Sequence, residues 1–262
     1  MATETVGGLT VEHQPPAGRA RHLPLLLIHG MWGGAWYWES YMRFAADAGW
    51  DVWAVNLRGH HGSRPVADLG RVSVRDYLAD VAAVLEAIGP AAIVGHSMGG
   101  LIAQMAATRP DVRAAVFLTS AAPRGIVVLR WPVLSRLARY MPAMVAQRPF
   151  KTRDEDAVAL LLNGMTPAAR TAALPRFVPE SGRAGLELAL GLLAVNPRDV
   201  RCPTLVMGAS DDQITPVAVQ RRIAARYDAH YLEAPHHAHM LMLEEDWQPP
   251  CRQILDWLAA HT

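Results

Sequence analysis

A serine between two glycines, in residues 95–99 (Gly-His-Ser-Met-Gly), is the part of the sequence best suited to carry chemistry. The small and apolar residues 91–94 before it predict a buried strand, and residues 101–107 after it predict a helix. A serine at the tip of such a turn has a strained backbone, and side chains two places before or after it would collide with the neighbouring strand and helix. The glycines remove those side chains, so we expect Ser97 to stand clear of the sheet as a nucleophile.

The helix that follows Ser97 points free N–H groups and a positive dipole end at any oxyanion that develops beside the serine. A serine hydroxyl is a poor nucleophile at neutral pH, so the reaction also needs a base, an acid and an oxyanion hole. Candidates lie in three loops that are each expected to leave the carboxyl end of a strand: residues 29–34, Asp212 and His239. Ligand sites of open parallel sheets lie beyond these ends. The order serine, acid, histidine is the one expected for this elbow topology.

Strands that alternate with helices predict the frame that would hold these residues. Such alternation implies right-handed crossovers and a mostly parallel sheet. The apolar run at 25–28 is typical of a strand covered on both faces. The remaining expected strands are 9–13, 51–56, 112–118, 203–208 and 230–233, and the expected helices are 36–46, 74–88, 217–227 and 247–260.

The alternation stops between residues 122 and 196. This stretch is rich in proline and helix-like segments, such as 129–145 and 154–162, and it carries arginines with no acid before Asp154. A basic helix on a membrane surface would fit these arginines, but we prefer solvated arginines over a helical cap packed on the core. We therefore predict an α/β core made of residues 1–121 and 197–262, with a helical cap at 122–196 inserted between strands.

Length and composition set the class of protein. The 262 residues, 51% of them hydrophobic, fit one large α/β domain. A formal charge of +1 gives no general attraction to nucleic acid or acidic membranes. Only two cysteines are present, Cys202 and Cys251, which excludes a framework of several disulfides but not a single bridge. Without a signal sequence or a run that could span a bilayer, we expect a cytoplasmic protein that acts on a small molecule without a cofactor, and a homodimer is compatible with this.

Five stretches, spread over nearly the whole chain, together resemble the α/β-hydrolase superfamily. They are 29–32 (His-Gly-Met-Trp), 58–60 (Arg-Gly-His), 95–100, 212–216 (Asp-Gln-Ile-Thr-Pro) and 238–240 (Ala-His-Met). The resemblance implies the α/β-hydrolase fold, in which a mostly parallel central sheet is flanked by helices. It also implies the roles of the site residues: nucleophile for Ser97, general base and acid for His239, orientation of His239 for Asp212, and an oxyanion hole for the backbone N–H groups of Met31 and Met98.

Neighbouring residues compete for two of these roles. Asp211 competes with Asp212, which we prefer because it stands immediately before Gln-Ile-Thr-Pro, as the acid of the family usually does. His236 and His237 compete with His239. Three histidines could also suggest a metal, but no matching carboxylate or cysteine spacing accompanies them, so we expect none.

We expect other polar residues near the motifs to lie outside the catalytic triad. We expect His96 to pack behind the site, and His60 and His61 to lie in a surface loop rather than in the site. Asn56 stands where these proteins often have aspartate, and His60 is followed by a second histidine instead of the commoner glycine. Neither departure touches the expected triad.

The sequence gives fewer indications of the substrate than of the triad. Met31, Trp32 and Trp36 favour a hydrophobic pocket mouth, and Gly30 allows close approach of a ligand. Trp131 and other apolar cap residues could line an acyl pocket, although most such residues would serve to pack the cap on the core. We therefore predict a carboxylic ester with an apolar acyl or alcohol part as substrate, with Gly30, Trp32 and Trp131 as binding residues.

These residues are compatible with three functional hypotheses. A serine carboxylester hydrolase that works through an acyl-enzyme is the first, because triad, oxyanion hole and elbow are all represented. The second is another enzyme on the same triad, such as a hydroxynitrile lyase, a cofactor-free haloperoxidase or an acyltransferase. The third is a ligand-binding module without catalysis, which has no physical need for all three triad residues. Epoxide hydrolases and haloalkane dehalogenases resemble this fold but use a carboxylate where this chain has Ser97.

Overall fold

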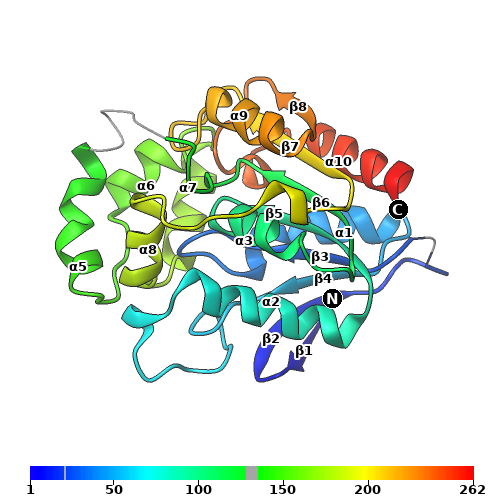
Figure 1. The fold of residues 1–262 in the computed structure, drawn as a ribbon, viewed down its shortest axis with the longest axis horizontal. Helices are drawn as coiled ribbons and strands as arrows, with labels where there is room; N and C mark the ends of the chain where they lie inside the picture. Colours follow the sequence, from blue (N-terminus) through cyan, green and yellow to red (C-terminus); the bar gives the residue numbers. More distant parts are fainter. Residues whose placement is uncertain (21, 128–134) are drawn as a thin grey trace.

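The computed structural model describes residues 1–20, 22–127 and 135–262, and it is built around one eight-stranded sheet (Figure 1). The strand order is β1-β2-β4-β3-β5-β6-β7-β8; β1 and β2 pair antiparallel, β2 and β4 pair antiparallel, and the rest of the sheet is parallel. The expected mostly parallel sheet is confirmed. The strands are β1 (Ala2–Val6), β2 (Leu9–Gln14), β3 (Leu25–Ile28), β4 (Val52–Val55), β5 (Ala91–His96), β6 (Val112–Leu118), β7 (Thr204–Ala209) and β8 (His230–Ala234).

Helices cover both faces of the sheet, and the alternation of side chains along β3 explains why both must be covered. Leu25 and Leu27 belong to one apolar cluster, and Leu26 and Ile28 belong to the other. The first cluster includes residues of α1 (Glu39–Asp47) and α10 (Gln248–His261). The second includes residues of α2 (Val74–Ile88), α3 (Met98–Ala106) and α9 (Val217–Tyr227).

The ends of the expected elements follow ordinary local rules. Ser73 caps α2 in a capping box with Asp76, and Gly89, with a φ of +80°, ends it. The helix expected at 36–46 is divided into a 3₁₀ turn and α1. Short 3₁₀ turns are η1 (Ala35–Trp38), η2 (Leu69–Arg71), η5 (Pro197–Asp199) and η6 (Leu241–Leu243).

Strand β1 adds to the elements expected from the sequence. It forms a hairpin with β2 through Gly7 and Gly8, whose φ angles are +57° and +80°. Two consecutive positive φ angles are typical of a type I′ hairpin turn, which favours glycine at both positions. The Gly-Gly pair was therefore the local signal for this strand.

The chain between β6 and β7 forms helices at one end of the molecule, on the left in Figure 1. We call the described residues of 122–196 the insertion. An isolated bridge pairs Phe150 with Glu180 within it. Trp131 and residues 129–134 of the expected helix lie outside the described residues. The helical segments are η3 (Ala138–Tyr140), α5 (Met141–Val145), α6 (Asp154–Leu160), α7 (Pro167–Ala173), η4 (Leu174–Arg176) and α8 (Gly182–Ala189).

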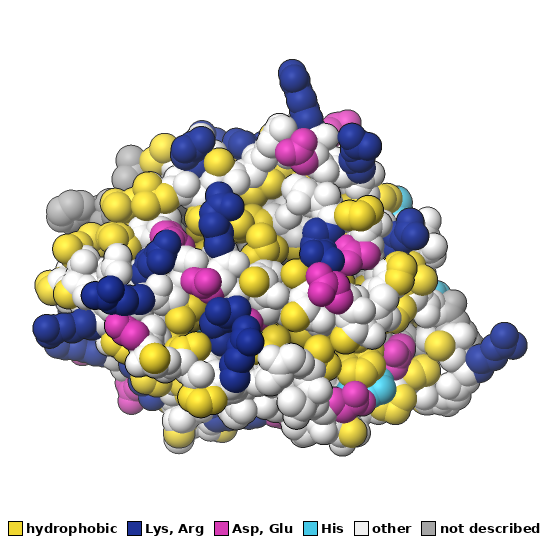
Figure 2. All heavy atoms as spheres, turned by 60° about the horizontal axis from the view of Figure 1, so that its bottom comes forward, with side chains coloured by type: hydrophobic (Ala, Val, Ile, Leu, Met, Phe, Trp, Pro, Cys, Tyr) yellow, Lys and Arg dark blue, Asp and Glu magenta, His cyan; other side chains and the backbone are white. Residues whose placement is uncertain are grey.

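The surface carries both signs of charge. Figure 2 shows basic and acidic side chains interspersed over one face, in keeping with the net charge of +1. Cys202 and Cys251 are free thiols. Among the described residues, no helix is long and apolar enough to cross a membrane.

Candidate active site

Ser97 occupies the tight turn between β5 and α3. Its φ of 55° and ψ of −117° lie where residues other than glycine are strained. A side chain on Gly95 would put its Cβ 2.1 Å from the carbonyl oxygen of Gly99, and one on Gly99 would put it 2.4 Å from that of Ile28. Both contacts are with backbone, so only glycine fits, as the sequence predicts.

The backbone N–H of Met98 lies immediately after the serine. Met98 is the first residue of α3, so its N–H has no carbonyl in the preceding turn of helix to bond with. The positive end of the helix dipole is at the same place. The side chain of Met98 is fully buried, so only the backbone of this residue could contribute to an oxyanion hole.

Asp212 and His239 are joined by a hydrogen bond in which His239 Nδ1 donates to Asp212 Oδ2 at 2.9 Å, and both side chains are buried. The other carboxylate oxygen, Oδ1, accepts the backbone N–H groups of Ile214 at 2.7 Å and Thr215 at 2.9 Å. The hydroxyl of Thr215 donates to Oδ2 at 2.7 Å. Burial alone would raise the pKa of Asp212, but His239 and the Thr215 donors hold it below its ordinary value. Asp212 is therefore a preorganised carboxylate that orients an imidazole.

The backbone of His239 is fixed against the elbow. His96 Nε2 donates to the carbonyl oxygen of His239 at 3.0 Å, and the hydroxyl of Thr119 donates to the same oxygen at 3.2 Å. Burial lowers the pKa of His96 well below its usual value, so this ring stays neutral. Because His96 directly precedes Ser97, the bond joins the loop of His239 to the turn of Ser97.

The loop after β3 runs against the same turn. A Cβ on Gly30 would lie 3.0 Å from the Cβ of Ser97, so glycine permits this approach. His29 Nε2 accepts the N–H of Leu57 at 3.2 Å, which leaves the proton on Nδ1 to donate to the carbonyl oxygen of Gly30 at 2.8 Å. In a trans peptide the N–H of Met31 points opposite to that carbonyl. His29 therefore fixes the direction of the Met31 N–H.

The aromatic residues of this loop contact the insertion. Trp32 and Trp36 are each 7% exposed. Trp32 lies edge-on to Phe150, with ring centroids 5.7 Å apart, and Trp36 lies edge-on to Phe177 at 5.8 Å. These contacts attach the insertion to the loop beside Ser97.

The residues that compete for the acid and base roles lie elsewhere. Asp211 is exposed and accepts a hydrogen bond from the Ser210 hydroxyl. His236 is exposed, and His237 is paired with Glu244 at 2.8 Å. The geometry therefore brings together Asp212 and His239 and separates their sequence neighbours from that pair.

The expectation of a surface position for His60 is wrong. His60 is 1% exposed, and its Nε2 lies 3.3 Å from Oε2 of Glu180, a residue that belongs to none of the sequence motifs. His61 is half-buried. The polar, glycine-bounded composition of residues 58–63 suggests solvent, but the insertion covers part of this loop. Asn56 is also buried, and its Oδ1 accepts the N–H of Ala35 at 2.8 Å.

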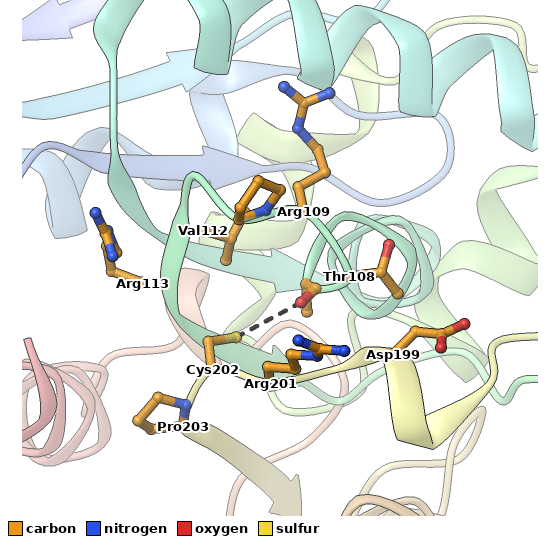
Figure 3. A pocket seen from close by; sticks show the side chains of 10 residues that line it. Thr108, Arg109, Val112, Arg113, Asp199, Arg201, Cys202 and Pro203 are labelled. Carbon is orange, nitrogen blue, oxygen red and sulfur yellow. Dashed lines mark hydrogen bonds between the residues drawn. The ribbon is translucent and has the colours of Figure 1, made fainter.

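A surface hollow of about 570 Å³ lies at the other end of the sheet, where β6 and β7 begin (Figure 3). Cys202 lies in its lining, and burial raises the pKa of the Cys202 thiol to about 11. A thiol with such a pKa is not a reactive thiolate at neutral pH. Ser97, Asp212 and His239 are not in the lining, so this hollow is separate from these three residues.

Comparison with known proteins identifies the family of this chain. A family model described as the alpha/beta hydrolase family matches residues 25–249. The chain belongs to the α/β-hydrolase family. Its fold is shared with a solved structure from Mycobacterium tuberculosis, provisionally named non-heme bromoperoxidase BpoC, with a TM-score of 0.77, 21% identity and coverage of 100% of this chain and 99% of that one.

Two curated relatives of this α/β hydrolase carry names of hydrolases. The chain is 33% identical over 210 residues to the pimeloyl-[acyl-carrier protein] methyl ester esterase of Chromobacterium violaceum, covering 75% of this chain and 80% of that protein. It is 27% identical over 280 residues to a protein of Variovorax paradoxus provisionally named carbamate hydrolase RutD, covering 94% of each. Its family and these relatives thus indicate that the protein is a hydrolase.

Proposed function

We propose that this hydrolase cleaves carboxylic esters with an apolar acyl or alcohol part through an acyl-enzyme, with Ser97, His239 and Asp212 as its catalytic triad. The observation that carries the proposal is the buried Asp212–His239 hydrogen bond of 2.9 Å, tied through His96 to the strained turn of Ser97. A receptor without catalysis gains nothing from a serine held in such a backbone.

In the first half-reaction, His239 takes the proton of the Ser97 hydroxyl while its oxygen attacks the carbonyl carbon of the ester. The negative charge that develops on the carbonyl oxygen is stabilised by the N–H groups of Met31 and Met98; a single such donor contributes about 3–4 kcal/mol. The imidazolium then gives its proton to the leaving alcohol, and the acyl group stays on Ser97.

In the second half-reaction, water attacks the acyl-enzyme. His239 takes a proton from the water, a second tetrahedral oxyanion forms in the same oxyanion hole, and the proton returns to Ser97 as the carboxylic acid leaves. Asp212 remains ionised throughout, because it stabilises the imidazolium and holds its tautomer. The lowered pKa of Asp212 supports this role.

We further propose that residues 122–196 act as a cap over this site and contribute to an apolar pocket. Met144, Phe150 and Phe177 of the insertion share one apolar cluster with Trp32 and with Met240, the residue after the catalytic histidine. Met31 is partly exposed and packs against the same cluster. An apolar acyl chain fits such surroundings better than a charged one.

Initial rates on p-nitrophenyl esters of short, medium and long acyl chains test the proposal, with the wild type beside Ser97→Ala. We expect the substitution to lower the rate by about 10⁴-fold or more, and an optimum of chain length to indicate the size of the pocket. Equal rates at all lengths would count against an apolar acyl pocket. Folded wild type that hydrolyses no ester would leave the lyase, haloperoxidase, acyltransferase or binding-module readings.

The relative from Variovorax paradoxus gives a carbamate as a second candidate, because the likeness covers 94% of this chain. The same triad could attack the carbonyl carbon of a carbamate. A p-nitrophenyl carbamate in the same series separates the two. A kcat/KM for the carbamate above that of every ester would favour the second candidate.

A further inference from the structure

Glu180 belongs to the insertion, yet its carboxylate is completely buried beside the loop that follows β3. Each of its oxygens meets two partners. Oε1 accepts the hydroxyl of Tyr77 at 2.6 Å and the N–H of Ser181 at 2.7 Å. Oε2 accepts the backbone N–H of Trp32 at 3.3 Å and lies 3.3 Å from His60 Nε2. The carboxylate thus joins the insertion, α2 and two loops of the core.

The contact with Trp32 lies one residue after the proposed oxyanion donor. The peptide group between Met31 and Trp32 is held at both ends, because its carbonyl oxygen accepts the hydroxyl of Tyr37 at 3.1 Å and its N–H donates to Glu180. The carbonyl oxygen of Trp32 accepts the N–H of Val178 at 3.0 Å. The insertion therefore bonds both backbone groups of Trp32.

The backbone of Trp32 needs such support. Its φ is 59°, in the left-handed region, which is unfavourable for a bulky aromatic residue. Strained residues of this kind persist only where the surroundings hold them, and they are concentrated at functional sites. If the Glu180 contact is lost, we expect Trp32 to relax to a negative φ. The loop would then follow a different path at Met31.

The charge of Glu180 is also maintained. Burial alone would raise the pKa of its carboxyl, but the charge of His60 and the hydrogen bonds of Tyr77 and Ser181 hold it below its ordinary value. Burial would lower the pKa of His60, but Glu180 raises it overall. His60 and Glu180 thus each favour the charged form of the other, and with Glu180 ionised its contact with Trp32 is a charge-assisted hydrogen bond.

We propose that Glu180 is a positioning residue for the oxyanion hole: its carboxylate holds Trp32 in the left-handed conformation and so directs the N–H of Met31 toward the acyl oxygen at Ser97. The inference rests on the proposed function. It gives the insertion a part in catalysis, because the oxyanion hole is complete only when residues 178–181 are seated against the loop.

The substitution Glu180→Gln separates positioning from simple packing. Tyr77 and Ser181 both donate to Oε1, so the amide oxygen takes that side and the amide nitrogen faces the N–H of Trp32. This removes the Trp32 bond and retains those of Tyr77 and Ser181. The matched control is Tyr77→Phe, which removes one hydrogen bond from the same carboxylate on the side away from Trp32.

Both variants are assayed on the p-nitrophenyl ester that the wild type hydrolyses fastest, with urea denaturation alongside. We expect Glu180→Gln to lower kcat by about 10- to 100-fold with KM within about threefold, because a displaced oxyanion donor weakens the transition state more than the ground state. The rate at which a fluorophosphonate labels Ser97, with loss of fluoride, should fall in parallel. Tyr77→Phe should lower the urea midpoint with kcat within about twofold of wild type.

Equal kcat values for Glu180→Gln, Tyr77→Phe and the wild type would overturn this inference alone. If Glu180→Gln does not fold, Glu180→Asp replaces it in the test. The shorter side chain keeps the charge beside His60 and withdraws its oxygens from Trp32. An unchanged kcat for Glu180→Asp would also overturn the inference. A wild type with no ester hydrolysis and no labelling that depends on Ser97 would instead refute the proposed function.

Discussion

Asp212 and His239 share a buried hydrogen bond of 2.9 Å, and the opposite oxygen of Asp212 is taken by two backbone N–H groups. This arrangement dictates what Asp212→Asn would do. The backbone donors would select the amide oxygen, so the amide nitrogen would face His239 Nδ1 and donate to it. The proton of the imidazole would move to Nε2, the atom that must accept the proton of Ser97.

We therefore expect Asp212→Asn to lower kcat by about 10⁴-fold, as expected for the wrong tautomer, with little change in KM. The matched control is Asp211→Asn, because Asp211 is exposed and its carboxylate accepts the hydroxyl of the neighbouring Ser210 rather than a bond from His239. Steady-state kinetics on a p-nitrophenyl ester check both. A larger loss in Asp211→Asn than in Asp212→Asn would transfer the acid role to Asp211.

The strained backbone of Ser97 predicts an unusual order of stabilities. Ser97→Ala and Ser97→Gly both lack the proposed nucleophile and should both be inactive. Glycine accepts a φ of 55° without strain, so Ser97→Gly should be more stable than Ser97→Ala by about 1 kcal/mol. Equilibrium unfolding in urea measures the difference.

The control for this pair is Ala169→Gly in α7, where glycine should cost about 0.5–1 kcal/mol. The two alanine-to-glycine differences should therefore have opposite signs. The same sign at both positions would mean that the elbow of Ser97 is not strained.

Gly99 predicts a loss of both stability and activity. A Cβ at this position would lie 2.4 Å from the backbone oxygens of His29 and Ile28, which cannot move without shifting β3. Gly99→Ala should lower the free energy of unfolding by about 2–3 kcal/mol and should reduce kcat, because α3 and the Met98 N–H would move with it. Gly18→Ala, where no atom lies within 4 Å, should change neither. Similar unfolding curves for the two variants would contradict the prediction.

The parts of the site that the sequence predicted are those with a local cause. The strand, glycines and helix around Ser97 are contiguous, and the steric need for Gly95 and Gly99 follows from the turn itself. The alternation of strands and helices likewise follows from periodicity within each segment. The placement of the loops at one end of the sheet then follows from parallel topology.

Glu180 could not be predicted in this way. It lies 148 residues from Trp32 in the chain, and its sequence neighbours Pro179 and Ser181 do not indicate a buried carboxylate. Its burial depends on His60 and Tyr77, which come from two other parts of the fold. The burial of His60 could not be predicted for the same reason. The composition of residues 58–63 indicates a loop, but it does not indicate that the insertion covers this loop.

His29 predicts how the stability of the protein responds to acid. Burial, together with the nearby His60, lowers the pKa of His29 from its ordinary value of 6.5 to about 3. Between these values the unfolded chain binds a proton that the folded chain does not, so the folded state loses stability as the pH falls from 6.5 toward 3. One such group contributes a slope of up to about 1.4 kcal/mol per pH unit.

His29→Asn isolates this contribution. Its amide nitrogen can replace Nδ1 as donor to the carbonyl oxygen of Gly30, but it does not titrate. Urea unfolding at about pH 7 and pH 5 should show a loss of free energy that is smaller by about 2 kcal/mol in the variant than in the wild type. His96 and the carboxylates titrate in both proteins, so their contributions cancel in the comparison. An equal loss in the two proteins would mean that His29 is not held neutral by the fold, and the tautomer that directs the Met31 N–H would lose its support.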